Sequence, residues 1–178
     1  MQPTMFGEPD GQITPRLKEI VSTFKQAGFP VALSRNMDAW QKTHVALISP
    51  IANALYMAGV DNYRLEQMPE SLHLMVSDMG EGFKVLRELG IPITTSKLKL
   101  WEWLPETILV VLLKRWAKTK HFEIVVARHA NAARDEMQQL AAEFKVLTSQ
   151  TSVATLAIDR LDTYIDLHQP DSFGIAHT

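Results

Sequence analysis

The stretch that decides the fold runs from Trp40 to Gly59 and reads WQKTHVALISPIANALYMAG. Apolar residues fall nearly all round a helix of this length, so we expect one long helix that is packed by neighbours on several sides and runs through a core. Asp38 is the expected N-cap, and Gly59 is the expected glycine at the C-terminal end. The rest of the chain is organised around this helix.

Four polar or helix-breaking positions in this helix require an explanation. Pro50 cannot donate to the carbonyl of Ala46, which predicts a kink and a free backbone acceptor. Helical spacing projects Lys42, Ser49 and Asn53 toward one side, where a single ligand could meet an ammonium, a hydroxyl and an amide. The alternative is that Lys42 extends to solvent while Ser49 and Asn53 satisfy local backbone groups. The pattern leaves both interpretations open.

Composition excludes several classes of protein. The chain has 178 residues, no cysteine and a net charge of -2, so a disulfide scaffold, a thiolate metal site and a nucleic-acid-binding basic field are not expected. Residues 1–10 do not resemble a secretory signal, and the longest apolar run, Ile108–Leu113, is far short of the roughly 20 residues that cross a bilayer. We therefore expect a soluble, cytoplasmic protein without a membrane segment.

Residues 1–34 predict a small β-α-β unit. Strand ends surround a turn in Met5–Ile13, Thr14 caps a helix that ends at Gly28, and Phe29–Leu33 is a second strand whose proline places it at a sheet edge. A unit of this size cannot stand alone, and it resembles the end of a larger sheet.

Residues 35–167 predict a helical domain, and residues 168–178 a loose tail. A polar connection is expected over 61–67. About six helices follow the first two strands, and the later ones are expected over 69–90, 106–118, 122–147 and 152–167.

Few motifs that carry chemistry are present. The chain lacks Gly-x-Gly-x-x-Gly, a Walker A loop and Gly-x-Ser-x-Gly, and its six histidines never form His-Glu-x-x-His, so no metal site is expected. His44 and His129 are expected in the core or at its rim. Lys42 and Glu123 remain, each near the start of a helix, where Glu123 alone would simply complement the helix dipole. Together they could protonate a developing alkoxide and fix a substrate hydroxyl.

Four segments carry a resemblance to a known family. GEPDG at 7–11, TPR at 14–16, AGFPV at 27–31 and WQK at 40–42 resemble the ketopantoate reductase family, from the end of its nucleotide-binding domain into its helical domain. The similarity extends from about Phe6 to about Glu123. It implies an all-α, multi-helix C-terminal domain of the ketopantoate reductase and 6-phosphogluconate dehydrogenase type, preceded by a β-α-β remnant of a Rossmann domain.

The resemblance also implies a function. Members of the family reduce a 2-keto acid with NADPH in the cleft between a Rossmann domain and a helical domain. Lys42 matches the catalytic lysine that acts as general acid, Glu123 matches the substrate-binding glutamate, and Asn53 and Ser49 are further candidate cleft residues. The amide and hydroxyl groups that the family carries near Ala46 and in the helix before the glutamate are missing here, so strict specificity for ketopantoate is not expected.

Two functions follow as hypotheses. The chain is either the substrate-binding and dimerisation domain of an NADPH-dependent reductase, inactive without its Rossmann domain, or a non-catalytic helical module for self-association or partner binding. A homodimer is expected in both cases, because a missing domain would leave apolar side chains exposed. The candidates for this surface are Met5, Phe6, Phe29, Trp101 and Trp103.

Overall fold

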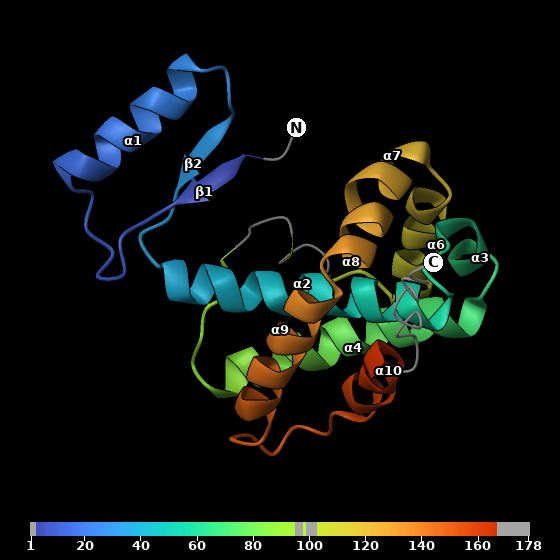
Figure 1. Ribbon diagram of the computed structural model, residues 1–178. Coiled ribbons are helices and arrows are strands. Elements are labelled where there is room, and N and C mark those ends of the chain that lie inside the picture. Colours follow the sequence, from blue (N-terminus) through green and yellow to red (C-terminus); the bar gives the residue numbers. More distant parts are fainter. Residues whose placement is uncertain (1–2, 95–97, 99–102, 167–178) are drawn as a thin grey trace, which may run out of the picture.

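The computed structural model describes residues 3–94, 98 and 103–166. It is mostly helical, with one small parallel sheet near the N-terminus. The predicted tail at 168–178 and Trp101 lie outside the described residues. Figure 1 shows the sheet and its helix beside the start of a long helix that runs through the helical body.

The predicted β-α-β unit is confirmed. Strand β1 (Thr4–Phe6) pairs in parallel with β2 (Val31–Leu33), and helix α1 (Pro15–Gln26) connects them. Thr14 caps α1 as expected, because its Oγ1 accepts from the backbone N–H of Leu17 at 3.1 Å. Glu8 ties the turn to this helix by accepting from Thr14 Oγ1 and Arg16 Nη2, each at 2.7 Å.

The long central helix is also confirmed, as α2 (Met37–Met57). Its N-cap is Asn36, whose Oδ1 accepts from Ala39 N at 2.9 Å, so the expectation of a cap at Asp38 was wrong by two residues. Pro50 lies inside one continuous helix. The second half of α2 is the centre of the core, where Leu55 and Tyr56 are 0% exposed.

Two helices follow α2. Helix α3 (Asn62–Glu66) corrects the expectation of an irregular connection over 61–67. It forms because Asp61 Oδ1 accepts from the backbone N–H groups of Tyr63 and Arg64, which caps the helix. Helix α4 (Pro69–Glu88) begins at the expected proline and packs along α2.

The chain beyond residue 103 differs most from expectation. Helix α6 (Glu106–Ala117) was predicted, but the single helix expected over 122–147 is interrupted. It consists of α7 (Lys120–Phe122), a π-helical turn η1 (Glu123–Ala127), α8 (Arg128–Ala132) and α9 (Arg134–Thr148). The break lies at Ala133, with φ -113° and ψ 33°. The guanidinium of the next residue, Arg134, lies 4.0 Å over the Tyr56 ring, a contact between the start of α9 and α2.

The last helix, α10 (Leu156–Asp166), begins four residues later than expected. Its first turn is held by Glu81 of α4, whose carboxylate accepts from Ala157 N and Ile158 N at 3.0 to 3.2 Å. Helices α2, α4 and α10 pack against one another, and α9 packs on α2. This arrangement leaves the first half of α2 beside α9.

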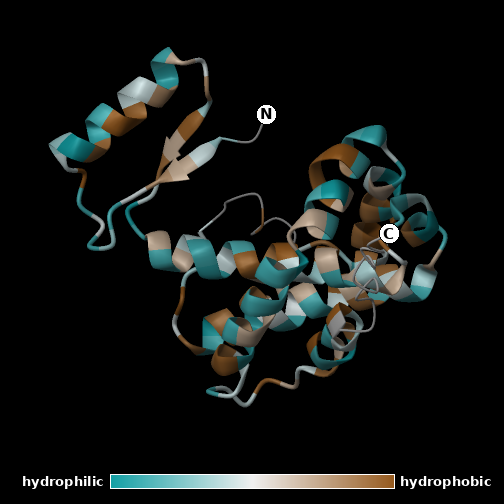
Figure 2. Cartoon of the chain, in the orientation of Figure 1, coloured by the Kyte–Doolittle hydropathy of each residue, from teal (hydrophilic) through white to brown (hydrophobic). Residues whose placement is uncertain are grey.

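Hydropathy follows the packing. Figure 2 shows hydrophilic and hydrophobic segments alternating along α1 and α4, as expected for helices that are buried on one side. Within the described residues, every helix is too short or too polar to traverse a lipid bilayer.

Candidate functional site

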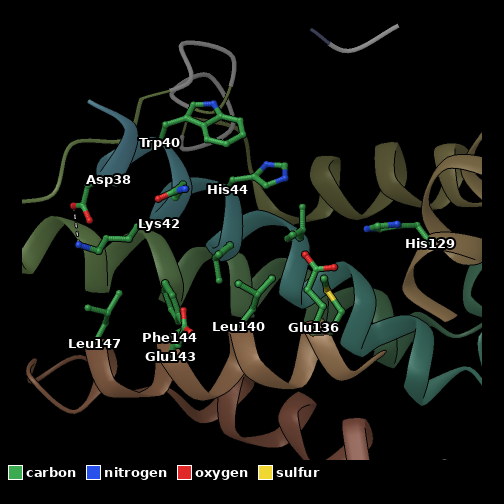
Figure 3. Close-up of a pocket in the computed structure, with 14 residues that line it drawn as sticks. Asp38, Trp40, Lys42, His44, His129, Glu136, Leu140, Glu143, Phe144 and Leu147 are labelled. Carbon is green, nitrogen blue, oxygen red and sulfur yellow. Dashed lines mark hydrogen bonds and ion pairs between the residues drawn. The ribbon is translucent and has the colours of Figure 1, made fainter. Parts of the chain in front are cut away.

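A groove lies between the first half of α2 and α9 (Figure 3). Its volume is about 510 Å³. The floor is apolar and comes from both helices: Val45 and Ile48 from α2, and Met137, Leu140, Phe144 and Leu147 from α9. The rim is polar and is formed by Asp38, Gln41, Lys42, His44, His129, Glu136 and Glu143, together with the Trp40 ring. A concave apolar surface with a few polar groups is typical of small-molecule sites.

Lys42 lies on the rim of this groove. Its Nζ is 2.7 Å from Asp38 Oδ2, one helical turn earlier, and its side chain is 31% exposed. The ammonium therefore faces solvent and the groove, rather than being locked in the core. Asp38 is its only charged partner among the described residues.

His44 lies on the same rim and stacks on Trp40. The two ring centroids are 5.0 Å apart and the planes are 9° from parallel. Burial lowers the pKa of His44 below its usual 6.5, which favours the neutral imidazole at pH 7. Its ring nitrogens have no hydrogen-bond partner within the described part of the chain, so they are available to a ligand in the groove.

Ser49 and Asn53 do not line this groove. Asn53 is 1% exposed, and its Nδ2 donates to Asp162 Oδ1 of α10 at 2.8 Å. Ser49 Oγ is buried and lacks a hydrogen-bond partner among the described residues. The helix therefore directs these two residues toward α4 and α10, whereas Lys42 and His44 face α9.

Glu123 lies in a different part of the molecule. Its carboxylate accepts from Lys120 Nζ at 2.8 and 2.9 Å, from Tyr63 Oη at 3.1 Å and from Arg128 Nη2 at 3.2 Å. The hydrogen bond from Lys120, followed by those from Tyr63 and Arg128, lowers the pKa of Glu123.

The groove does not bring Lys42 and Glu123 together. Glu123 is absent from its lining, and Tyr63, its partner, follows the far end of α2. The stretch of α2 from Lys42 to Met57 alone spans about 22 Å at roughly 1.5 Å per residue.

The groove contains residues that sequence reasoning did not single out as site residues. Asp38 was assigned to a cap, and Glu136 and Glu143 were not considered. The floor residues Met137, Leu140 and Phe144 had a signal, because helical spacing places them on one face. The sequence does not reveal that this face of α9 is only partly covered, or that it lines the groove together with α2.

The described residues contain no group of three or more histidine, aspartate or glutamate side chains that could hold a metal ion. Comparisons with family models, curated proteins and solved structures found no match for this chain.

Proposed function

We propose that this chain is the helical, substrate-binding part of an NADPH-dependent reductase of the ketopantoate reductase type, acting on a 2-keto acid or a related carbonyl compound. One observation carries the proposal. Lys42, the residue that the resemblance matches to the catalytic lysine, lies on the rim of a groove of about 510 Å³ with an apolar floor. A groove of this size accommodates a small keto acid.

The chemistry on this chain is proton donation and binding. The Lys42 ammonium can bind the carbonyl or carboxylate oxygen of a substrate and donate a proton to the oxygen as it gains charge. Asp38 holds the ammonium in the unliganded groove and would share it with the substrate. The neutral imidazole of His44 supplies a second donor on the same rim.

In our proposal NADPH is not held by the described residues. The glycines of the 7–11 turn pack against the chain itself, because a Cβ at Gly7 would collide with Met37 and one at Gly11 with the Arg35 carbonyl. They therefore allow close packing on the start of α2 and form no phosphate cradle. In our proposal the cofactor is held by a separate Rossmann domain, and it supplies the hydride.

The β-α-β unit supports this arrangement. Parallel sheets occur almost always with both faces covered, yet this sheet has two strands, and Phe29 and Leu33 are 51% and 45% exposed. The further strands and helices of a Rossmann domain would cover these residues. The unit leads directly into α2, so such a domain would lie near the end of α2 that carries Lys42.

The groove also favours a substrate class. Among the described residues that line it, Gln41 supplies the only side-chain amide, and none is a serine or threonine. An apolar floor of this kind suits a 2-keto acid with an aliphatic side chain better than the hydroxylated chain of ketopantoate.

Binding to the chain itself tests the proposal. Isothermal titration with 2-ketoisovalerate, ketopantoate and pyruvate should show binding, with the aliphatic acid preferred. Lys42→Met should weaken binding at least tenfold, whereas Lys18→Met, at an exposed position of α1, should leave it unchanged. Binding that is insensitive to Lys42→Met, or no binding of any of these acids, would contradict the proposal.

Turnover supplies the second test. A longer protein that joins this chain to a Rossmann domain should oxidise NADPH with the preferred acid, and Lys42→Ala should abolish that activity. The chain by itself should not oxidise NADPH.

A non-catalytic module for self-association is the second candidate. The outward face of α6 favours it, because Ile108, Val111, Leu112 and Trp116 are 36% to 48% exposed at helical spacing. We propose that this face joins two copies of the chain. Sedimentation should then show a dimer that Leu112→Asp dissociates, and a monomeric wild-type chain would contradict this candidate.

A further inference from the structure

A buried polar cluster joins α2, α4 and α10, on the side of α2 that faces away from the groove rim. Its members are Asn53 and Ser49 from α2, Asp78 from α4 and Asp162 from α10. Asn53 and Asp78 are 1% and 4% exposed. Asn53 Nδ2 donates to Asp162 Oδ1 at 2.8 Å, which links α2 to α10.

Three oxygen atoms of this cluster are buried without a hydrogen-bond partner among the described residues. They are Asp78 Oδ2, Asn53 Oδ1 and Ser49 Oγ. An unpaired buried polar atom costs about 1–3 kcal/mol, and more when it is charged. Two of these atoms, Asp78 Oδ2 and Asn53 Oδ1, can only accept hydrogen bonds. The cluster therefore needs a further donor, and a proton on a carboxylate would supply one.

A small cavity lies within the cluster. Ser49, Asp78 and Asp162 line it, and its volume is about 10 Å³, which is about the space of one water molecule. The remaining lining is uncharged: Val45, Ala46 and Pro50 from α2, Ala141 and Phe144 from α9, and Ile158 from α10.

Among the described residues, none of the side chains that line this cavity is basic. The other carboxylate near Asp78 is Glu81, which already accepts from Ala157 N and Ile158 N. Lys145 of α9 pairs with Asp159 on the exposed side of α10, at 3.4 Å. Burial first, and then the charges of Asp162 and Glu81, raise the pKa of Asp78 well above its usual value.

We propose that Asp78 carries a proton in the folded chain, beside Asp162 at the interface of α4 and α10, and that this proton helps to hold α10 on the helical body. The protonated carboxyl of Asp78 supplies the missing donor, and the buried side chain is then uncharged. Loss of the proton leaves a buried carboxylate on α4 beside the part-buried Asp162 of α10, which favours separation of α10.

The groove is coupled to this interface. Val45 and Phe144 line both the groove and the small cavity, so they form the wall between them. Release of α10, which buries Ile158, Leu161 and Ile165 against the body, would remove the support behind that wall. The proton on Asp78 thus makes the shape of the groove dependent on pH.

The sign follows from proton binding. Because the folded chain holds the proton more tightly than the unfolded chain, stability is greatest below the unfolded pKa of about 3.8 and falls as pH rises toward the raised folded pKa. Within that window the tendency of Asp78 to lose its proton lowers the folding equilibrium constant by up to tenfold for each unit by which the pH rises.

The experiment compares urea unfolding of the chain at half-unit steps from pH 5 to pH 9. Asp78→Asn keeps the shape and supplies an N–H donor that cannot be lost, so its stability should fall less steeply with pH than that of the wild type. Asp135→Asn, at an exposed position of α9, removes the same charge and should keep the wild-type slope. Amide hydrogen exchange in α10 should accelerate with pH beyond the intrinsic rate in the wild type but not in Asp78→Asn.

Two results would overturn the proposal. Identical pH slopes for the wild type and Asp78→Asn would show that Asp78 does not carry the proton. Stabilisation of the wild type, but not of Asp78→Asn, by millimolar Mg²⁺ or Ca²⁺ at pH 8 would show that the oxygens bind a cation instead. If Asp78→Asn does not fold, Asp162→Asn provides the same comparison from the other helix.

Discussion

Lys42 Nζ lies 2.7 Å from Asp38 Oδ2, and both residues lie on the rim of the groove. The pair has the (i, i+4) spacing of a helix with the acid on the N-terminal side, which is the favourable order. Such an exposed pair contributes only about 0.3–0.5 kcal/mol to stability. The pair therefore affects the charge at the rim of the groove more than the stability of α2.

Asp38→Asn should strengthen the binding of a 2-keto acid, because the Lys42 ammonium loses its competing carboxylate. We expect a severalfold lower dissociation constant in calorimetric titration, and a change of about 0.5 kcal/mol or less in the free energy of unfolding. Asp10→Asn, in the exposed turn before α1, should leave the dissociation constant unchanged. Weaker binding in Asp38→Asn would show that the acid, and not the lysine, contacts the ligand.

Tyr56 links α2 to α8, and its loss should be costly. The side chain is 0% exposed, and its Oη donates to the Ala130 carbonyl at 2.8 Å. Tyr56→Phe keeps the ring under Arg134 but leaves that carbonyl without this donor, which should lower the free energy of unfolding by about 1–2 kcal/mol. Tyr63→Phe, at an exposed position, should cost about 0.5 kcal/mol or less in the same urea titration. Equal losses in the two variants would mean that the buried hydrogen bond contributes little.

Sequence reasoning predicted the helices better than their interruptions. Hydrophobic spacing was sufficient to predict α2 and α4, because each buries a regular pattern of apolar side chains. It did not predict the break at Ala133, because no glycine or proline marks that position as the end of a helix.

The residues of the candidate site were also predicted only in part. Lys42 was found from local sequence, and it lies on a groove. The facing residues Glu136 and Glu143 were missed, because only the packing of α9 beside α2 brings them there. Asp78 had a signal that was not used, since it lies three residues after Met75, on the side of α4 that is buried.

Glu123 should titrate below its ordinary pKa of 4.5, because of the hydrogen bond from Lys120 and then those from Tyr63 and Arg128. The stability that this cluster contributes is therefore present above about pH 4.5 and is lost as pH falls through the lower, folded pKa. Carboxyl NMR titration should show the midpoint of Glu123 rising in Lys120→Met. Lys118→Met, on the same basic stretch, should leave it unchanged, because the hydrogen bonds that lower the pKa of Glu123 come from Lys120, Tyr63 and Arg128. A wild-type midpoint at or above 4.5 would contradict the assignment.

Two glycines of α4 should respond in opposite ways to the same substitution. A Cβ at Gly80 meets nothing within 4 Å, so Gly80→Ala should stabilise the chain by about 0.5–1 kcal/mol through helix propensity. A Cβ at Gly82 would lie 3.2 Å from Ala46 Cβ and 3.5 Å from Phe144 Cζ. There the gain in propensity is offset by an overpacking cost of about 1–3 kcal/mol, so Gly82→Ala should destabilise the chain or leave it unchanged.

Urea unfolding of the two variants measures this difference directly, and each variant serves as the control for the other. Gly82→Ala should also alter keto acid binding, because it presses on Phe144, which forms part of the groove floor. Gly80→Ala should not, since Gly80 does not line the groove. Equal stabilisation by both substitutions would mean that α2 and α9 can move to accommodate a methyl group at this point. The packing between the groove and the small buried cavity would then be looser than the contact of Gly82 with Ala46 implies.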